Sequence, residues 1–171
     1  PGPLTMVYPS TDKVSPLVSC GLKTLAIRVP SSETAQAFLR AVDVPIAAPS
    51  ANVSKHISPV TAKHVFEDFS GRIPLILDGG RCEGGIESPV LDCTGPAPMI
   101  LRAGLVTQEM IASVAGSCGV YVPKPGEQPK SPGMAYKHYA PKCHTALFAP
   151  EELDQAKALY REEEKRGGVP C

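Results

Sequence analysis

Residues 24–54 read TLAIRVPSSETAQAFLRAVDVPIAAPSANVS, and the first half of this stretch indicates a strand followed by a helix. In residues 24–29, apolar side chains alternate with small, polar or basic ones, as expected of a strand with one buried face. Ser31 and Ser32 then suit a helix N-cap, and apolar residues such as Phe38 and Val42 follow at helical spacing. A strand that leads into an amphipathic helix is typical of the α/β class.

The second half of the stretch indicates a strand that ends in a polar loop. Residues 44–48 are a short apolar run, and residues 49–54 (PSANVS) follow without a break. In α/β sheets, ligands bind in loops just beyond the carboxyl end of a strand. The loop 49–54 is therefore the first place where we expect a ligand.

Further elements are predicted on the carboxyl side of this loop. Ser58 and Pro59 suit the N-cap and first position of a helix that runs to about Gly71, and Thr107 suits the N-cap of another that ends at Gly116. Between them lie three short apolar runs bounded by Gly or Pro, which favour strands. They comprise residues 75–77, 90–91 and 99–101.

Length and composition exclude several classes of protein. The 171 residues carry 17 Lys and Arg against 17 Asp and Glu, so no broad positive field would hold DNA or an anionic membrane. No apolar run reaches the roughly 20 residues that span a bilayer, which argues against a membrane protein. The six cysteines form no CxxC pair, so zinc is not expected, and we predict a protein of the reducing cytoplasm.

The chain beyond residue 120 differs in composition. Residues 123–132 are rich in proline and lack an apolar period, which indicates a linker. A strand at residues 145–148 and a helix at residues 151–165 follow, too little to form a domain alone. We predict a first domain at residues 1–120, a linker or lid at residues 121–142, and the start of a second, truncated domain at residues 143–171.

Standard signatures for phosphate loops, acyl transfer and metalloproteases are absent. The candidate functional residues are instead small polar and basic side chains at the ends of strands and in loops, and they suit an anionic ligand. They are Thr24, Arg28, Ser50, Asn52, Ser58, Ser88 and Arg102.

Three of these residues also have a purely structural interpretation. Ser58 could bind phosphate at a helix N-terminus or simply cap the helix. Arg28 could pair with a ligand carboxylate or lie along the surface with its charge in water. Arg102 could approach phosphate or form a surface salt bridge. The residues alone leave these alternatives open.

Two other features admit the same kind of choice. Glycines at 79, 80, 84 and 85 predict unusual backbone angles, in a ligand loop or in a plain connection. His138, Cys143 and His144 could be imagined as metal ligands, but their Tyr and Pro neighbours favour a packed or nucleotide-stacking segment. No metal site is predicted.

Taken in order, several segments of the chain resemble the L-threonylcarbamoyladenylate synthase family, in its long form with a YrdC-like domain and a second domain. The combination of PSAN with a later SPGMAYKHYAP is the most specific part. The segments are PGPLT (1–5), TLAIRVP (24–30), PIAAPSAN (45–52), SP (58–59), ILDGG (76–80), ESPVLDCTG (87–95), ILRAG (100–104) and SPGMAYKHYAP (131–141).

The resemblance implies a fold and an activity. The fold would be a twisted mixed sheet with helices around a concave cavity, followed by a linker and the start of a small Rossmann-like domain. The activity would be synthesis of threonylcarbamoyl-AMP and pyrophosphate from L-threonine, bicarbonate and ATP with Mg²⁺. The product would pass to the machinery that transfers threonylcarbamoyl to tRNA.

The resemblance also implies roles for individual residues. The ATP contacts would be Thr24, Ser50, Asn52, Ser58, Arg102, Tyr136, His138 and Tyr139, and the L-threonine contacts would be Arg28, Ala48 and Ser88. Arg102 would also meet the charge that develops at the α-phosphate. The linker residues Tyr136, His138 and Tyr139 would form a lid over the nucleotide.

Departures from the family pattern qualify these expectations. Pro89 stands where a hydroxyl residue is usual, Ala103 replaces a proline, and Ala135 replaces a basic residue. An N-terminal portion with further triphosphate contacts would also be missing, so we expect the 171 residues alone to be inactive.

Two other functions remain as alternatives. One is a non-catalytic module that binds double-stranded RNA, and the other is a carbamoyltransferase of the hydrogenase-maturation type.

Overall fold

The computed structural model describes residues 1–19, 21–54, 56–122 and 145–168. The chain divides into two compact units, Pro1–Ala140 and Pro141–Cys171. All of the described strands lie in the first unit.

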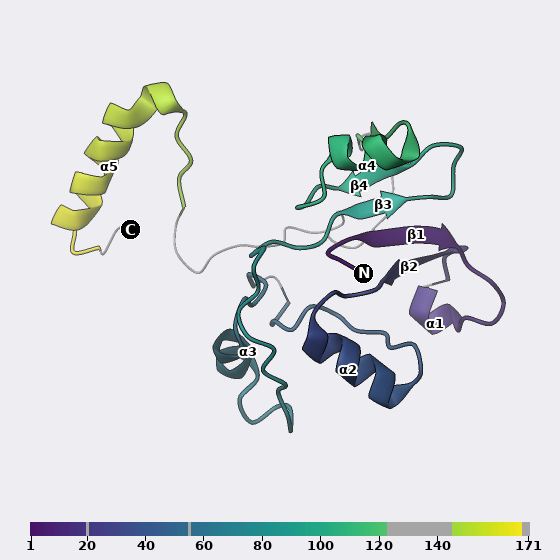
Figure 1. Ribbon diagram of the computed structural model, residues 1–171. Helices are drawn as coiled ribbons and strands as arrows, with labels where there is room; N and C mark the ends of the chain where they lie inside the picture. Colours follow the sequence, from purple (N-terminus) through teal and green to yellow (C-terminus); the bar gives the residue numbers. More distant parts are fainter. Residues whose placement is uncertain (20, 55, 123–144, 169–171) are drawn as a thin grey trace. The chain divides into compact units, whose positions relative to one another are not determined.

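A five-stranded mixed sheet forms the centre of the first unit, with the strands in the order β2-β1-β3-β4-β5. Figure 1 shows β2, β1, β3 and β4 in this order. β1 is antiparallel to β2 and parallel to β3, while β4 is antiparallel to β3 and parallel to β5. The sheet confirms the predicted α/β class. The strands are β1 (Thr5–Pro9), β2 (Thr24–Arg28), β3 (Val90–Asp92), β4 (Met99–Arg102) and β5 (Gly119–Val120).

The core follows from the alternation of side chains along β3 and β4. Val90 and Leu101 form one buried cluster, together with Val7 of β1. Their neighbours Leu91 and Ile100 form a second cluster with Ile111 of helix α4. Because successive side chains of a strand point to opposite faces, these short strands supply apolar residues to both faces of the sheet.

Three helices of the first unit begin at hydroxyl residues that accept a hydrogen bond from the first turn. Ser32 caps α2 (Glu33–Val42), Thr61 caps α3 (Ala62–Phe69), and Thr107 caps α4 (Gln108–Ala115). The caps at Ser32 and Thr107 confirm two predicted helix starts. A further one-turn helix, α1 (Pro16–Ser19), joins β1 to β2 and was not predicted.

The prediction that Ser58 caps a helix is wrong. α3 begins after Thr61, and the hydroxyl of Thr61 accepts from the backbone N–H of His64. Thr61 is the better cap because its extended backbone places the hydroxyl beside the first turn. Ser58 lies in the loop before this helix, so α3 offers it no helix N-terminus for phosphate.

Three predicted strands are also wrong. Residues 44–48, 75–77 and 145–148 belong to no strand of the structure. Ile46 and Leu75 are 43% and 71% exposed. An apolar run becomes a strand only where a neighbouring strand completes its backbone hydrogen bonds, and the described residues place none beside these runs.

The second unit contains a 3₁₀ turn, η1 (Pro150–Glu152), followed by helix α5 (Leu153–Lys165). The predicted helix at residues 151–165 is thereby confirmed in position. The predicted linker at residues 123–132 lies outside the described residues, as do His138, Cys143 and His144.

In the part of the chain that the structure describes, no helix combines the length and apolar character needed to cross a bilayer.

Candidate functional site

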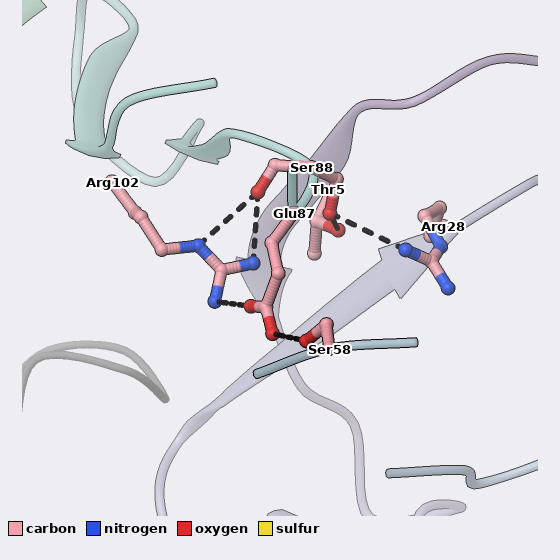
Figure 2. A network of polar contacts seen from close by, with 6 residues as sticks. All are labelled: Thr5, Arg28, Ser58, Glu87, Ser88 and Arg102. Atoms are coloured by element: carbon pink, nitrogen blue, oxygen red, sulfur yellow. Dashed lines mark hydrogen bonds and ion pairs between the residues drawn. The ribbon is translucent and has the colours of Figure 1, made fainter. Parts of the chain in front are cut away.

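Four strand ends meet along one edge of the sheet. β1 and β3 begin there, while their antiparallel neighbours β2 and β4 end there. The register pairs Thr5 with Arg28 and with Val90, and Val90 in turn with Arg102. Two arginines that are 74 positions apart in the sequence therefore share one row across the sheet (Figure 2).

Ser88 stands at the centre of this edge, two residues before β3, and is 5% exposed. Its hydroxyl accepts a hydrogen bond from Arg28 Nη1 at 3.4 Å and lies 2.8 Å from the hydroxyl of Thr5. The backbone beside it is fixed too, because the N–H of Thr5 donates to the carbonyl of Pro89 at 3.0 Å. A buried hydroxyl in such a position has its partners supplied from two strands.

Arg102 is held by the dipeptide Glu87–Ser88. Its Nε and Nη2 donate to the carbonyl oxygen of Ser88 at 3.1 and 2.8 Å. Its Nη1 donates to Glu87 Oε2 at 2.5 Å. The salt bridge predicted as an alternative for Arg102 is therefore present. It belongs to a larger network of hydrogen bonds between the end of β4 and the dipeptide Glu87–Ser88.

Ser58 completes the network from the loop before α3. Its hydroxyl donates to Glu87 Oε1 at 2.8 Å, so Ser58 and Arg102 bind different oxygens of that carboxylate (Figure 2). The network, which we call the edge network, comprises Thr5, Arg28, Ser58, Glu87, Ser88 and Arg102.

The charges of the edge network favour an anionic ligand. The network contains two guanidinium groups and one carboxylate, which leaves one positive charge in excess; Arg102 pairs with Glu87, while Arg28 contacts Ser88. Arg28 is exposed, while the side chains of Arg102 and Glu87 are 21% and 24% exposed. A ligand from solvent can therefore reach both arginines.

Asn52 organises its own loop. Its Nδ2 donates to the carbonyls of Val53 and His56, at 2.9 and 3.1 Å. Asp68 of α3 fastens the same loop by accepting from the Val53 N–H and by pairing with His56. The Oδ1 of Asn52 is buried and has no hydrogen-bond partner among the described residues.

The structure brings together four of the predicted site residues, Arg28, Ser58, Ser88 and Arg102. Thr24 is at the other end of β2 from Arg28, about 13 Å away at the usual rise of a strand. Ala48 and Ser50 lie in an exposed segment outside the edge network.

The remaining predicted ATP contacts are Tyr136, His138 and Tyr139, which lie outside the described residues.

Two members of the edge network, Thr5 and Glu87, carry no role in the sequence analysis. Both lie in segments that support the family resemblance, PGPLT and ESPVLDCTG. The sequence motifs around Thr5 and Glu87 could be identified, but the contacts of these two residues depend on the pairing between β1, β3 and β4.

Unusual backbone angles were predicted for the four glycines at 79, 80, 84 and 85, and two of them have positive φ. Gly80 and Gly85 have φ values of 86° and 63°. Gly104 has a different constraint, because a Cβ there would lie 2.5 Å from Pro89 and 2.8 Å from the carbonyl oxygen of Glu87. The exit of β4 therefore passes directly against the backbone that holds the edge network.

The fold and the edge network define an α/β protein in which two arginines and several hydroxyl groups gather at one edge of a mixed sheet. Two family models match the chain: one described as "Telomere recombination" (Sua5, YciO and YrdC) over residues 1–104, and one described as "Threonylcarbamoyl-AMP synthase, C-terminal domain" over residues 106–171. The chain belongs to this Sua5/YrdC family of threonylcarbamoyl-AMP synthases.

Curated relatives that carry the name threonylcarbamoyl-AMP synthase match nearly the whole chain. The Bacillus subtilis protein is 43% identical over 99% of this chain, and the Pyrococcus abyssi protein is 39% identical over the same share. The chain spans 50% and 52% of these two relatives, about half of their length.

Solved structures give the same result. The Pyrococcus abyssi Sua5 protein in complex with L-threonine has a TM-score of 0.85 and 37% identity, and the match covers 98% of this chain and 51% of that one. A doubly substituted variant of the same protein has a TM-score of 0.68 and 44% identity over 71% of this chain and 37% of that one.

Proposed function

We propose that this chain is part of an L-threonylcarbamoyladenylate synthase, which forms threonylcarbamoyl-AMP and pyrophosphate from L-threonine, bicarbonate and ATP. The observation that carries the proposal is the edge network, in which two arginines and two serines expected at the ligands converge from separate segments. Relatives at about 40% identity that bear this enzyme's name support it.

L-threonine would bind at Arg28 and Ser88. The Arg28 guanidinium is exposed at the end of β2 and can pair with a carboxylate, while Ser88 holds it in place from the other side. The name of one related structure records bound L-threonine, which supports an amino-acid site in the family. Ala48 would contribute its backbone, on the strength of the resemblance.

ATP would bind on the Arg102 side of the network, with Ser58 beside the phosphates. Arg102 would meet the negative charge that increases on the α-phosphate during the reaction. The other proposed ATP contacts rest on the family resemblance, and the last three of them would form the lid over the nucleotide. They are Thr24, Ser50, Asn52, Tyr136, His138 and Tyr139.

The chemistry needs no covalent intermediate on the protein. The threonine amine and bicarbonate would form a carbamate with loss of water, and a carbamate oxygen would attack the α-phosphorus of ATP. The new P–O bond replaces the bond to the β-phosphate, and pyrophosphate leaves. The protein's part is to orient the reactants and stabilise charge, which fits a site built of arginines and hydroxyls.

Mg²⁺ would enter with ATP as the Mg–ATP complex. Both Glu87 oxygens have partners within the edge network, and among the described residues no cluster of three His, Cys, Asp or Glu could hold a metal. Phosphate oxygens and water would therefore supply most of its ligands.

The finer features of the family are part of the same proposal. The domain would span residues 1–120 around a concave cavity, with a lid at residues 121–142 and a small Rossmann-like domain from residue 143. The product would be consumed by the machinery that modifies tRNA.

Pyrophosphate release by the full-length protein that contains this chain tests the proposal. We expect release that depends on ATP, L-threonine and bicarbonate together. Arg28→Met should raise KM for L-threonine about tenfold or more, because a charge-assisted hydrogen bond contributes roughly 1.5–3 kcal/mol. Arg40→Met is the matched control, since Arg40 is exposed on α2 and donates a hydrogen bond to Gln36 of the same helix.

Two results would contradict the proposal. One is pyrophosphate release that does not require L-threonine, and the other is binding of double-stranded RNA without any nucleotide-dependent turnover. The 171-residue chain assayed alone would test the expectation that it is inactive.

A further inference from the structure

Glu87 links the two proposed ATP contacts without itself being expected at a ligand. Its Oε2 accepts from Arg102 Nη1 and its Oε1 accepts from the Ser58 hydroxyl. The next residue, Ser88, holds Arg102 through its carbonyl and Arg28 through its hydroxyl. The dipeptide Glu87–Ser88 therefore joins the nucleotide side of the edge network to the amino-acid side.

The contacts fix the plane of the Arg102 guanidinium. An arginine side chain has five N–H donors in one rigid plane. Three of these five N–H groups, one each on Nε, Nη1 and Nη2, donate to Glu87 and Ser88. One further N–H on each Nη remains for a ligand, and its direction is set by the bonds already made.

The contact with Glu87 also sets how Ser58 can act. A hydroxyl has one hydrogen to donate and two lone pairs. Since the Ser58 hydrogen is directed at Glu87, the oxygen presents lone pairs to an incoming group. Ser58 in this state would accept a hydrogen bond, for example from a ribose hydroxyl or a water on Mg–ATP.

The ion pair itself adds little to the stability of the fold. The side chains of Arg102 and Glu87 are 21% and 24% exposed, and the cost of removing two charges from water offsets much of the attraction between them. Orientation of Arg102 and Ser58 is the more substantial effect, because a side chain held before binding loses less entropy when the ligand arrives.

We propose that Glu87 is a positioning residue for ATP, which holds Arg102 and Ser58 in their binding orientation before the nucleotide arrives. This inference rests on the proposed function and assigns a residue to that site. Glu87 touches neither reactant in this scheme and acts through Arg102 and Ser58.

The test compares Glu87→Ala and Glu87→Gln in the full-length protein that contains this chain, with Mg–ATP binding measured by calorimetry. We expect Glu87→Ala to weaken ATP binding at least tenfold and to change KM for L-threonine less than twofold. Glu87→Gln keeps an acceptor for Ser58 and loses the charge, so it should fall between. Glu83→Ala is the control, because Glu83 is an exposed carboxylate in the preceding loop.

A second measurement separates positioning from a general structural role. If Glu87 acts through Arg102, then Glu87→Ala should change ATP binding less than threefold in an Arg102→Met background. The temperature midpoint of unfolding should be the same for the wild type and Glu87→Gln within a few degrees.

Several outcomes would overturn the inference. The first is an ATP affinity of Glu87→Ala that equals that of the wild type. The second is a higher ATP affinity in Glu87→Ala, which would mean that Glu87 competes with phosphate for Arg102. The third is an equal loss of affinity for ATP and for L-threonine. A wild-type protein that binds no ATP and releases no pyrophosphate would overturn the proposed function as well. Normal wild-type turnover with an unaffected Glu87→Ala would overturn this inference alone.

Discussion

At the scale of single residues, the hydroxyl of Ser88 links strands that are distant in sequence. It accepts from Arg28 of β2 and lies within hydrogen-bond distance of Thr5 of β1. Its own backbone precedes β3. A side chain with 5% exposure and two such partners has little freedom to rotate, so Arg28 is held by a nearly rigid group.

Thr5→Val tests the importance of this arrangement, because valine keeps the shape of threonine and removes the hydroxyl. We expect L-threonine to bind about three- to tenfold more weakly and the protein to lose roughly 1 kcal/mol of stability, the usual contribution of one hydrogen bond. Calorimetric titration with L-threonine and thermal unfolding measure the two effects.

Thr11→Val is the control for this variant, since Thr11 is exposed in the connection after β1. Unchanged L-threonine affinity in Thr5→Val would contradict a role for Thr5 in holding Ser88.

At the scale of secondary-structure elements, the exit of β4 must pass close to the start of β3. A Cβ on Gly104 would lie 2.5 Å from two atoms of Pro89. Pro89 is fully buried and cannot move aside, and its carbonyl is bonded to Thr5. The two segments that carry Arg102 and Glu87 are therefore in direct backbone contact.

Gly104→Ala should destabilise the protein by about 1–3 kcal/mol, the usual cost of overpacking a tight site. It should also weaken ATP binding, because the backbone of Glu87–Pro89 must shift. Denaturant unfolding and calorimetry with Mg–ATP measure these effects. Gly95→Ala is the control, since a Cβ at Gly95 would meet only one backbone oxygen at 3.8 Å; equal effects of the two substitutions would exclude the clash as the cause.

Helix α4 allows a prediction about pH. Thr107 caps this helix, and hydrogen bonding to the Thr107 hydroxyl and to its own backbone lowers the pKa of Glu109 from its ordinary value of 4.5. A carboxyl whose pKa is lowered in the folded state stabilises the fold above its unfolded pKa, and this contribution is lost as pH falls through the folded value. The loss is therefore expected below about pH 4.5.

Thr107→Ala should cost about 1 kcal/mol through loss of the cap. It should also return the pKa of Glu109 toward its ordinary value and reduce the part of the acid dependence that Glu109 causes. Thermal unfolding between neutral and acid pH and an NMR titration of Glu109 measure these changes. Ser113→Ala, which alters an exposed hydroxyl on the same helix, should leave the titration unchanged.

At the scale of the whole molecule, the edge network connects both halves of the proposed site. Residues assigned to L-threonine and to ATP meet at two consecutive positions, Glu87 and Ser88. The family models and the relatives match nearly the whole chain. The model that covers residues 1–104 includes every residue of the edge network.

We therefore expect the two ligands to bind cooperatively. L-threonine should raise the affinity for Mg–ATP by a factor of about 5–150, and ATP should raise the affinity for L-threonine by the same factor, because binding linkage is reciprocal. Titrations of the full-length protein in both orders measure the two factors. Affinities that are independent of the other ligand would contradict a shared network.

Much of the local structure could be predicted from short-range signals. Ser32 and Thr107 start helices because a hydroxyl beside the first turn satisfies a free N–H, a contact within three residues. β1 was missed because TMVYP has one buried residue and ends in proline, which weakens the strand pattern. Ser58 was misassigned because a second hydroxyl, Thr61, lies three residues later and makes the cap.

The amino-acid sequence alone determined the α/β class, two of the helix caps, and the family, because these depend on local hydrogen bonds and on motifs that lie within single segments. Only the tertiary structure decided which side chains form the edge network. Thr5 and Ser88 are 83 positions apart, and Arg28 and Ser88 are 60 apart. Such contacts follow from strand order and register, which many distant residues set together, and this is why Thr5 and Glu87 could not be assigned from sequence.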